Sequence, residues 1–279
     1  MCVGGEAMGQ PLSRMADVIR ASRADIVGLQ EVQTDSKIDN GQKLAELLGW
    51  NYLPQAGANG ILTRFTILQP TPHGHGALLR TPSGREILHF NVHLAHAPYQ
   101  PYQLLAIRYG RDAVFIKTES EAIAQARAAR GHQVEALLDD RRASGASGCP
   151  TFITGDFNEP SHLDWTSDAA RAGRCPIKVE FPSTRRIADA GFIDTYRQIH
   201  PDPVQSPGNT WTPTTRADDP KDRHDRIDFV MADRSVMVKS AQIIGEDAAH
   251  ADIVVSPWPT DHRGVLARVR LSEGSAAAH

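Results

Sequence analysis

Five short segments place side chains that can bind a cation or move a proton where an apolar run stops. In chain order they are Leu29-Gln30-Glu31, Asn91-Val92-His93, Gly155-Asp156-Phe157-Asn158, Arg226-Ile227-Asp228-Phe229 and Thr260-Asp261-His262. A single aspartate after a strand is more often a turn former or a helix cap. Catalytic groups, however, are usually built on loops at the ends of strands, and five such endings in one chain indicate a site.

The spacing of apolar residues predicts the elements that would position these segments. Helices are predicted over residues 11–21, 42–48, 118–142 and 183–190, and strands over 25–31, 50–54, 60–68, 76–80, 85–93, 151–154, 226–231 and 264–271. Residues 81–84, Thr-Pro-Ser-Gly, are a turn signal, so the strands on either side of them should form a hairpin. The intermixed helices and strands, with no linker or internal repeat, favour one α/β domain.

The composition is that of an ordinary globular enzyme, with 41% apolar and 23% charged residues among 279. The formal net charge of -3 excludes a bulk positive field that would hold nucleic acid non-specifically. Cys2, Cys149 and Cys175 lack CxxC spacing, which favours reduced thiols, with one Cys149–Cys175 bridge as the alternative. No apolar run approaches the ~18 residues that span a bilayer, and residues 1–10 lack the features of a signal peptide. We therefore expect a cytoplasmic monomer.

Taken in order, the five segments resemble the motifs of the endonuclease/exonuclease/phosphatase superfamily. This superfamily includes pancreatic deoxyribonuclease, abasic-site endonucleases, neutral sphingomyelinases and inositol-polyphosphate 5-phosphatases. The most specific segments are Gly-Asp-Phe-Asn at 155–158, the later Asp261-His262, and Leu-Gln-Glu-Val at 29–32. The resemblance covers residues 12–271 and implies a four-layered α/β/β/α sandwich of two packed mixed β-sheets, with the active site at one edge.

The resemblance also implies a reaction, the hydrolysis of a phosphodiester or phosphomonoester by in-line attack of an activated water. Such esters resist attack because their oxygens are anionic, and a hard divalent cation held by carboxylates neutralises the charge that builds in the transition state. By this resemblance Glu31 and Asp261 are the expected ligands of Mg²⁺ or Mn²⁺.

Five further roles follow from the same resemblance. Asp156 would orient or deprotonate the attacking water, and Asn158 would hold that water or a phosphoryl oxygen. Asp228 would fix the tautomer of His262 and favour its cationic form beside the phosphate. His93 matches the histidine of the deoxyribonuclease and sphingomyelinase branches that supports the phosphate or protonates the leaving oxygen. Abasic-site endonucleases resemble this chain less, since tyrosine is typical there.

Three more residues are candidates for contact with the substrate. Arg64 stands in a Leu-Thr-Arg-Phe run that resembles the family's Leu-Ser-Arg-Tyr, and bracing of the sheet end is its alternative role. His96 follows His93 by three residues and could join it or merely line the pocket. Tyr99 opens a Tyr-Gln-Pro-Tyr loop whose aromatic faces could stack on the substrate or pack within the loop.

The start of the chain departs from the family pattern. Relatives begin with a strand that ends in asparagine, and Met-Cys-Val-Gly-Gly at residues 1–5 starts just after that position. We expect a single domain over 1–279, with residues 1–10 the remnant of a truncated start and 272–279 a disordered tail. A form extended upstream by such a strand should be more stable and more active. Loss of a signal peptide with that strand would make the protein secreted rather than cytoplasmic.

Three functions compete. The acidic balance and His93 favour a phosphoesterase that acts on a small molecule or a lipid headgroup. A metal-dependent nuclease acting on DNA or RNA is the runner-up. A binding protein on the same fold is the third reading, and the number of chemically active residues argues against it, because a pure binder has no need for all of them.

Overall fold

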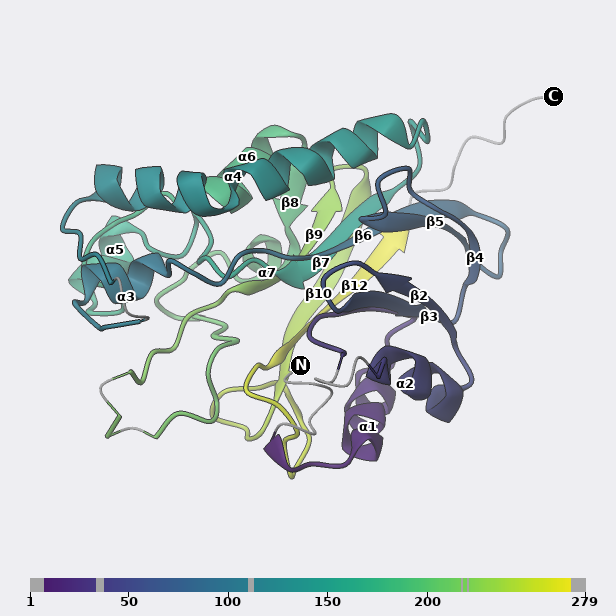
Figure 1. Cartoon of the computed structure of the whole chain (residues 1–279), viewed down its shortest axis with the longest axis horizontal. Helices are drawn as coiled ribbons and strands as arrows, with labels where there is room; N and C mark the ends of the chain where they lie inside the picture. Colours follow the sequence, from purple (N-terminus) through teal and green to yellow (C-terminus); the bar gives the residue numbers. More distant parts are fainter. Residues whose placement is uncertain (1–7, 34–37, 110–112, 217, 220, 272–279) are drawn as a thin grey trace.

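The computed structural model describes residues 8–33, 38–109, 113–216, 218–219 and 221–271 (Figure 1). Its helices are α1 (Leu12–Ser22), α2 (Asn40–Leu48), α3 (Gln100–Leu104), α4 (Glu119–Ala143), α5 (Ser167–Arg171), α6 (Pro182–Asp189) and α7 (Thr195–Ile199). Its strands are β1 (Ile26–Leu29), β2 (Asn51–Gln55), β3 (Asn59–Thr63), β4 (Thr66–Pro70), β5 (Gly76–Arg80), β6 (Glu86–His93), β7 (Thr151–Asp156), β8 (Phe192–Asp194), β9 (Asp228–Asp233), β10 (Val236–Gly245), β11 (Ile253–Val254) and β12 (Gly264–Leu271). This confirms the predicted α/β class.

The described strands form three sheets. The largest has six strands in the order β4-β5-β6-β7-β9-β8, in which β6 and β7 are parallel and the other neighbours are antiparallel. Two three-stranded sheets have the orders β1-β3-β2 and β11-β10-β12. In the last of these, β10 runs parallel to β11 and antiparallel to β12. Both parallel and antiparallel pairs are therefore present, as expected for mixed sheets.

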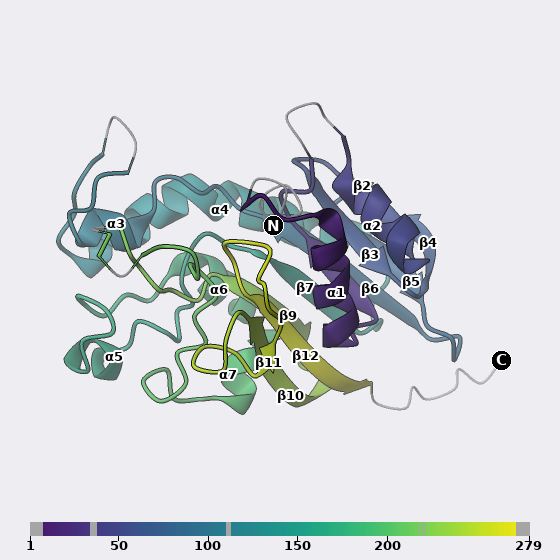
Figure 2. The same ribbon diagram turned by 90° about the horizontal axis from the view of Figure 1, so that it is seen from below.

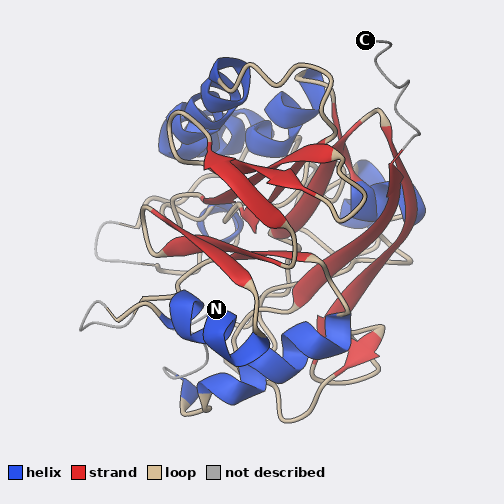
Figure 3. Ribbon diagram, turned by 90° about the vertical axis from the view of Figure 1, so that its right-hand side faces the viewer, coloured by secondary structure: helices blue, strands red, loops and turns tan. Residues whose placement is uncertain are grey.

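Apolar side chains fill three successive spaces between the helices and the sheets. One core packs α4 and α6 against the six-stranded sheet, and another packs α1 and α2 against β1, β3 and β12. Between them, side chains of β3 and β10 meet those of β5, β6, β7 and β9. Figure 3 shows the same arrangement, with helices on the two outer sides and strands between them.

The β1 strand packs directly against the six-stranded sheet, and the short distance between them requires glycine at position 28. A Cβ atom at Gly28 would collide with the Thr154 hydroxyl of β7 and the Asn91 amide of β6. Only glycine leaves room for this approach. The strand is shorter than its apolar run predicts, because the chain turns at Glu31, whose φ of 56° lies in the left-handed region.

Most predicted elements are confirmed, and the differences have local causes. The apolar run at residues 60–68 divides at Thr63 into β3 and β4, which belong to different sheets. The Thr63 hydroxyl holds that corner by donating to the carbonyl of Asp25 and accepting from the amide of Phe65. The long helix begins at a capping box in which Thr118 and Glu121 exchange hydrogen bonds. The ten-residue β10 was missed, because its Lys239-Ser240 interrupts the apolar alternation.

Parts of the expected ends cannot be compared with the structure. Residues 1–7 and the expected tail 272–279 lie outside the described residues, as does Cys2. Cys149 and Cys175 are free thiols, so the alternative of a bridge between them is wrong. Within the described part of the chain, no helix combines the length and the apolar character needed to cross a membrane.

Candidate active site

Strand register alone brings three of the predicted residues to one edge of the six-stranded sheet. Because β6 and β7 are parallel, both end at that edge, and His93 lies beside Asp156. Because β9 is antiparallel to β7, it begins at the same edge, and its first residue, Asp228, is the neighbour of Asp156. Side chains alternate along a strand. These three therefore point to the same face as the buried His89 and face the smaller sheets.

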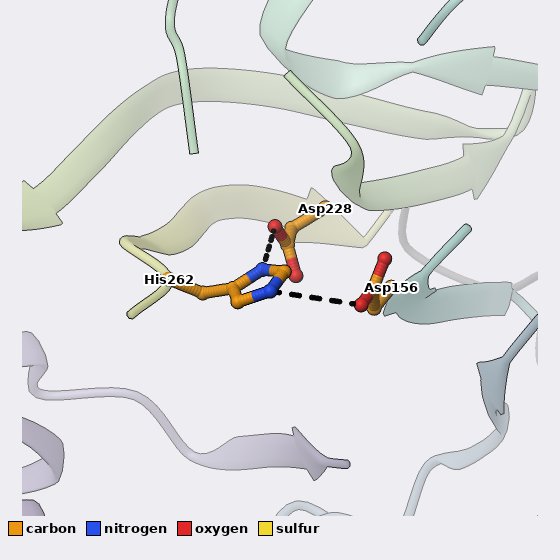
Figure 4. A group of neighbouring side chains, drawn as sticks. All are labelled: Asp156, Asp228 and His262. Carbon is orange, nitrogen blue, oxygen red and sulfur yellow. Dashed lines mark hydrogen bonds and ion pairs between the residues drawn. The ribbon is translucent and has the colours of Figure 1, made fainter. Parts of the chain in front are cut away.

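His262 reaches this edge from the loop that precedes β12 (Figure 4). Its Nδ1 lies 2.9 Å from Asp228 Oδ2, and its Nε2 lies 3.9 Å from Asp156 Oδ2. Burial lowers the pKa of His262, but the carboxylates of Asp228 and Asp156 and the hydrogen bond to Asp228 outweigh it and raise the pKa to about 9. The imidazole is therefore cationic at neutral pH. The expected pair of Asp228 and His262, called the dyad below, is present in this geometry.

Asp156 is buried and is held on both of its oxygens by Asn158. The Asn158 backbone N–H donates to Oδ1 at 2.8 Å, and its side-chain amide donates to Oδ2 at 3.2 Å. The φ of 49° at Asn158 lies in the left-handed region, which asparagine tolerates better than most residues. Burial and the neighbouring Asp228 raise the pKa of Asp156 to about 7. The amide of Asn158 also donates to the carbonyl of Leu94, so in this structure it braces the carboxylate.

His93 lies between two carboxylates. Its Nε2 is 3.6 Å from Asp156 Oδ2 and 3.9 Å from Glu31 Oε1. Burial, together with the cationic His262, lowers the pKa of His93 despite the carboxylates of Glu31 and Asp228, so the ring is neutral at pH 7. A neutral imidazole supports a phosphate with one hydrogen bond more readily than it protonates a leaving oxygen.

Thr210 holds the start of β9, and with it the dyad, in place. Its buried hydroxyl accepts hydrogen bonds from the backbone N–H groups of Ile227 and Asp228, at 3.0 and 3.1 Å. Trp211 forms an isolated antiparallel bridge with His262, while the indole N–H of Trp258 donates to the His262 carbonyl. The signal in the sequence was a hydroxyl residue before tryptophan, which is too common to predict this role.

Asn91 links the site to β1 and was not assigned a role from the sequence. Its amide nitrogen donates to the carbonyls of Leu29 and Gly60, and its Oδ1 accepts from Gln30 at 2.6 Å. Asn91 therefore fastens the end of β1, from which Glu31 projects. A buried amide in a mainly apolar strand is the signal that could have identified it, because buried polar groups require partners.

The donor set suits a hard cation. Carboxylate oxygens of Asp156 and Asp228 lie within 4.8 Å of each other and of His262, whose protonated ring cannot itself bind a metal, and the Glu31 carboxylate adjoins His93. Asp261, the other expected ligand, precedes His262, and its Oδ1 accepts a hydrogen bond from the Thr260 hydroxyl at 3.2 Å. Closely spaced carboxylates repel one another and an anionic substrate alike. A divalent cation with oxygen ligands offsets both effects.

The structure corrects the expected position of Arg64. Its backbone N–H donates to the carbonyl of Asp25, at the opposite end of β1 from Glu31. Its guanidinium is half exposed, lies 3.9 Å from the Asp25 carboxylate and covers the ring of Trp50. This position, at the far end of β1 from Glu31, favours the alternative role of Arg64, which is to brace the end of the sheet.

His96 and Tyr99 line a small recess beside Asn158. The recess has a volume of about 30 Å³, and its other walls are Tyr102, Tyr109, Trp211 and Ile227. Tyr99 is buried, its hydroxyl donates to Asp225 at 2.7 Å, and its ring packs edge-on against Trp211. The ring of His96 packs edge-on against that of Tyr109. Tyr99 thus serves as a wall, and His96 lies at the recess.

Comparison with known proteins places this geometry in a family. The model of the endonuclease/exonuclease/phosphatase family matches residues 3–262. An uncharacterized protein of Caenorhabditis elegans is 27% identical over 236 residues, which cover 78% of this chain and 71% of that protein.

Solved structures share the fold at lower identity. The 3′ phosphatase NExo from Neisseria, bound to a product DNA hairpin, is 18% identical with a TM-score of 0.55, and the match covers 93% of this chain and 94% of that one. A mannosyl-6-phosphatase from Bacteroides thetaiotaomicron is 16% identical with a TM-score of 0.54, over 96% and 95%. An endonuclease/exonuclease/phosphatase from Beutenbergia cavernae is 21% identical with a TM-score of 0.55, over 92% of this chain but 65% of that one. The chain belongs to the endonuclease/exonuclease/phosphatase family.

Proposed function

We propose that the protein is a divalent-metal-dependent phosphoesterase that hydrolyses a phosphodiester or phosphomonoester by in-line attack of water. The observation that carries this proposal is the cationic His262 between Asp228 and Asp156, at 2.9 and 3.9 Å. The positive charge of His262 is a partner for phosphoryl oxygens. The Asp156 carboxylate, whose pKa is near neutrality, is an acceptor for the proton of water.

Each residue of the site has its own role in this reaction. Asp156, braced by Asn158, accepts a proton from the attacking water as its oxygen bonds to phosphorus and the bond to the leaving oxygen breaks on the opposite side. His262 donates a hydrogen bond to a phosphoryl oxygen, and Asp228 keeps it protonated and oriented. His93 adds a further hydrogen bond to the phosphate.

Glu31 and Asp261 would hold Mg²⁺ or Mn²⁺ beside this constellation. When bound, such a cation supplies neutralisation of the charge that develops on the phosphoryl oxygens. Carboxylate oxygens are typical ligands of these hard ions, whereas zinc is more often bound by nitrogen and sulfur ligands. The adjacent carboxylates Asp156 and Asp228 support this assignment, because an anionic ester would otherwise meet uncompensated negative charge.

We favour a small molecule or a lipid headgroup as the substrate. The net charge of -3 gives no general attraction for a nucleic-acid backbone. The mannosyl-6-phosphatase among the structural relatives acts on a phosphosugar. A nuclease that acts on DNA or RNA is the second candidate, since another relative of the same fold is a 3′ phosphatase bound to a DNA hairpin.

A substrate panel tests both candidates. The protein is assayed with bis-(p-nitrophenyl) phosphate, p-nitrophenyl phosphate, phosphocholine lipids and supercoiled plasmid, each with Mg²⁺, Mn²⁺ or EDTA. Asp156→Asn and His262→Ala should each lower turnover by ~10² or more, as expected for a lost acid–base group. Asp168→Asn, at an exposed position on α5, is the matched charge control and should leave turnover unchanged.

The outcomes distinguish the two candidate substrate classes and test the assigned roles. Turnover of the chromogenic or lipid substrates without plasmid nicking supports the favoured class, and nicking alone supports the nuclease. Full turnover in EDTA after gel filtration would refute the metal dependence. Wild-type turnover by either site variant, with melting temperatures matched, would refute the assigned roles.

A further inference from the structure

Arg130 of α4 carries a buried charge that the proposed reaction does not use. Its side chain and that of Glu159 are both 0% exposed, and Nη1 of Arg130 lies 3.6 Å from Oε2 of Glu159. Neither side chain can therefore touch a substrate. Burial of an ion pair is costly, and apolar side chains of similar volume often serve stability equally well. What the pair holds in place therefore matters more than the stability that it adds.

The Arg130 guanidinium holds the end of the loop that follows His93. Its Nη1 donates to the side-chain carbonyl of Gln100 at 2.7 Å, and its Nη2 donates to the backbone carbonyl of Pro98 at 3.0 Å. The side-chain amide of Gln100 also donates to the Pro98 carbonyl, at 2.8 Å. Gln100 is the first residue of α3, and Figure 2 shows α3 beside α4. Arg130 thus fastens this end of the loop to α4.

Gln133, one turn further along α4, holds the beginning of the same loop. Its Oε1 accepts a hydrogen bond from the backbone N–H of Ala95 at 2.8 Å. Residues three apart lie on the same face of a helix, so Arg130 and Gln133 reach the loop together. His96 and Tyr99, which line the recess beside the active site, lie between the two attached ends.

Glu159 extends this attachment to a second loop of the site. It directly follows Asn158, and its Oε1 accepts from the backbone N–H of Ser183 in the first turn of α6 at 2.7 Å. The Glu159 carboxylate is therefore fixed between Arg130 of α4 and the start of α6. Its position determines where the chain leaves Asn158, whose left-handed φ of 49° requires support from its surroundings.

Asn158 is the point where the two loops meet. Its side-chain amide donates to the Leu94 carbonyl of the first loop and to Asp156 Oδ2. Its backbone N–H donates to Asp156 Oδ1. All three hydrogen bonds depend on how residues 94–100 lie against residues 156–159. A misplacement of about 1 Å at a catalytic group can lower a rate by ~10².

We propose that Arg130 and Gln133 are positioning residues, which fix the loop 94–100 against the loop 156–159 and so hold Asn158 on the carboxylate of Asp156. The catalytic importance of Asp156 rests on the proposed function, whereas the placement of the two loops is independent of it. Both residues act through Asn158 and not through the substrate. Their replacement should therefore lower turnover and leave the binding of a minimal phosphoester nearly unchanged.

Hydrogen exchange in the free protein tests the positioning without reference to catalysis. Arg130→Met/Glu159→Gln removes both charges of the pair together, so that neither is left buried alone. Gln133→Met removes the acceptor of the Ala95 N–H. In each variant the backbone amide of Asn158 should exchange about tenfold or more faster than in the wild type.

The same variants are then assayed with bis-(p-nitrophenyl) phosphate. Turnover should fall by about ten- to hundredfold, with KM within about twofold of the wild type. Gln133→Glu keeps an acceptor for the Ala95 N–H and should recover most of the turnover and the slow exchange at Asn158. A purely structural loss would not be restored by this one change.

Val236→Ala is the control for a general loss of stability. Val236 is buried in the core between the sheets and begins β10, beyond the end of β9 that is opposite to Asp228. Its truncation should lower the melting temperature but leave turnover and the exchange at Asn158 unchanged. An equal loss of turnover in Val236→Ala would overturn the proposal, and so would wild-type exchange at Asn158 in both loop variants. If exchange quickens in these variants while the wild type hydrolyses no substrate of the panel, the positioning stands and the proposed function fails.

Discussion

Acidification from pH 8 to pH 5 should cost the protein about 2 kcal/mol of stability through His89 alone. The ring is 3% exposed, and burial lowers its pKa from 6.5 to about 3. Because the folded-state pKa is depressed, the unfolded chain takes up a proton that the folded chain refuses. The contribution is therefore fully present above pH 6.5 and is lost as the pH falls towards 3. Each unit of pKa is worth about 1.4 kcal/mol, which gives about 5 kcal/mol for the whole transition.

Urea denaturation of the wild type and of His89→Gln at pH 8 and pH 5 measures this effect. The Thr154 hydroxyl lies 3.0 Å from His89 Nε2. Glutamine cannot take up a proton in this range but can still hydrogen-bond to that hydroxyl. The stability lost between the two pH values should therefore be about 2 kcal/mol smaller in the variant. His132→Gln, at an exposed position on α4, controls for the loss of a histidine and should behave like the wild type. Parallel pH dependence in His89→Gln and the wild type would show that His89 is not held neutral by burial.

Three further results are expected. Gly28→Ala should destabilise the fold by about 1–3 kcal/mol in urea denaturation, because its Cβ would collide with groups of the six-stranded sheet, whereas Gly131→Ala in the middle of α4 should not; equal stability of the two variants would contradict the close approach of β1. Thr210→Val should leave the N–H groups of Ile227 and Asp228 without their acceptor, at about 1–3 kcal/mol for each buried group, and should also lower turnover; unchanged turnover would mean that Thr210 does not position the dyad. Saturating Mg²⁺ should raise the melting temperature of the wild type, and a Glu31→Gln variant with an undiminished rise would remove Glu31 from the metal site.

The sequence by itself determined which residues stand at the ends of strands. The runs before Asp156 and His93 are short and mainly apolar, and the strands β7 and β6 end at these two residues. The family pattern added the order of the segments, and with it the pairing of Asp228 with His262. Helices α1, α2 and α6, whose apolar residues have clear amphipathic spacing, were predictable because helix formation depends on neighbours three and four residues apart.

Only the tertiary structure decided how these ends meet and which residues hold them. Register between β6, β7 and β9 placed His93, Asp156 and Asp228 side by side, and strand register depends on partners distant in the sequence. Arg64 likewise lies at the far end of β1 because of how β1 pairs with β3, which the local sequence does not specify. The shifted pKa of His262 arises from burial and two carboxylates that no local pattern brings together.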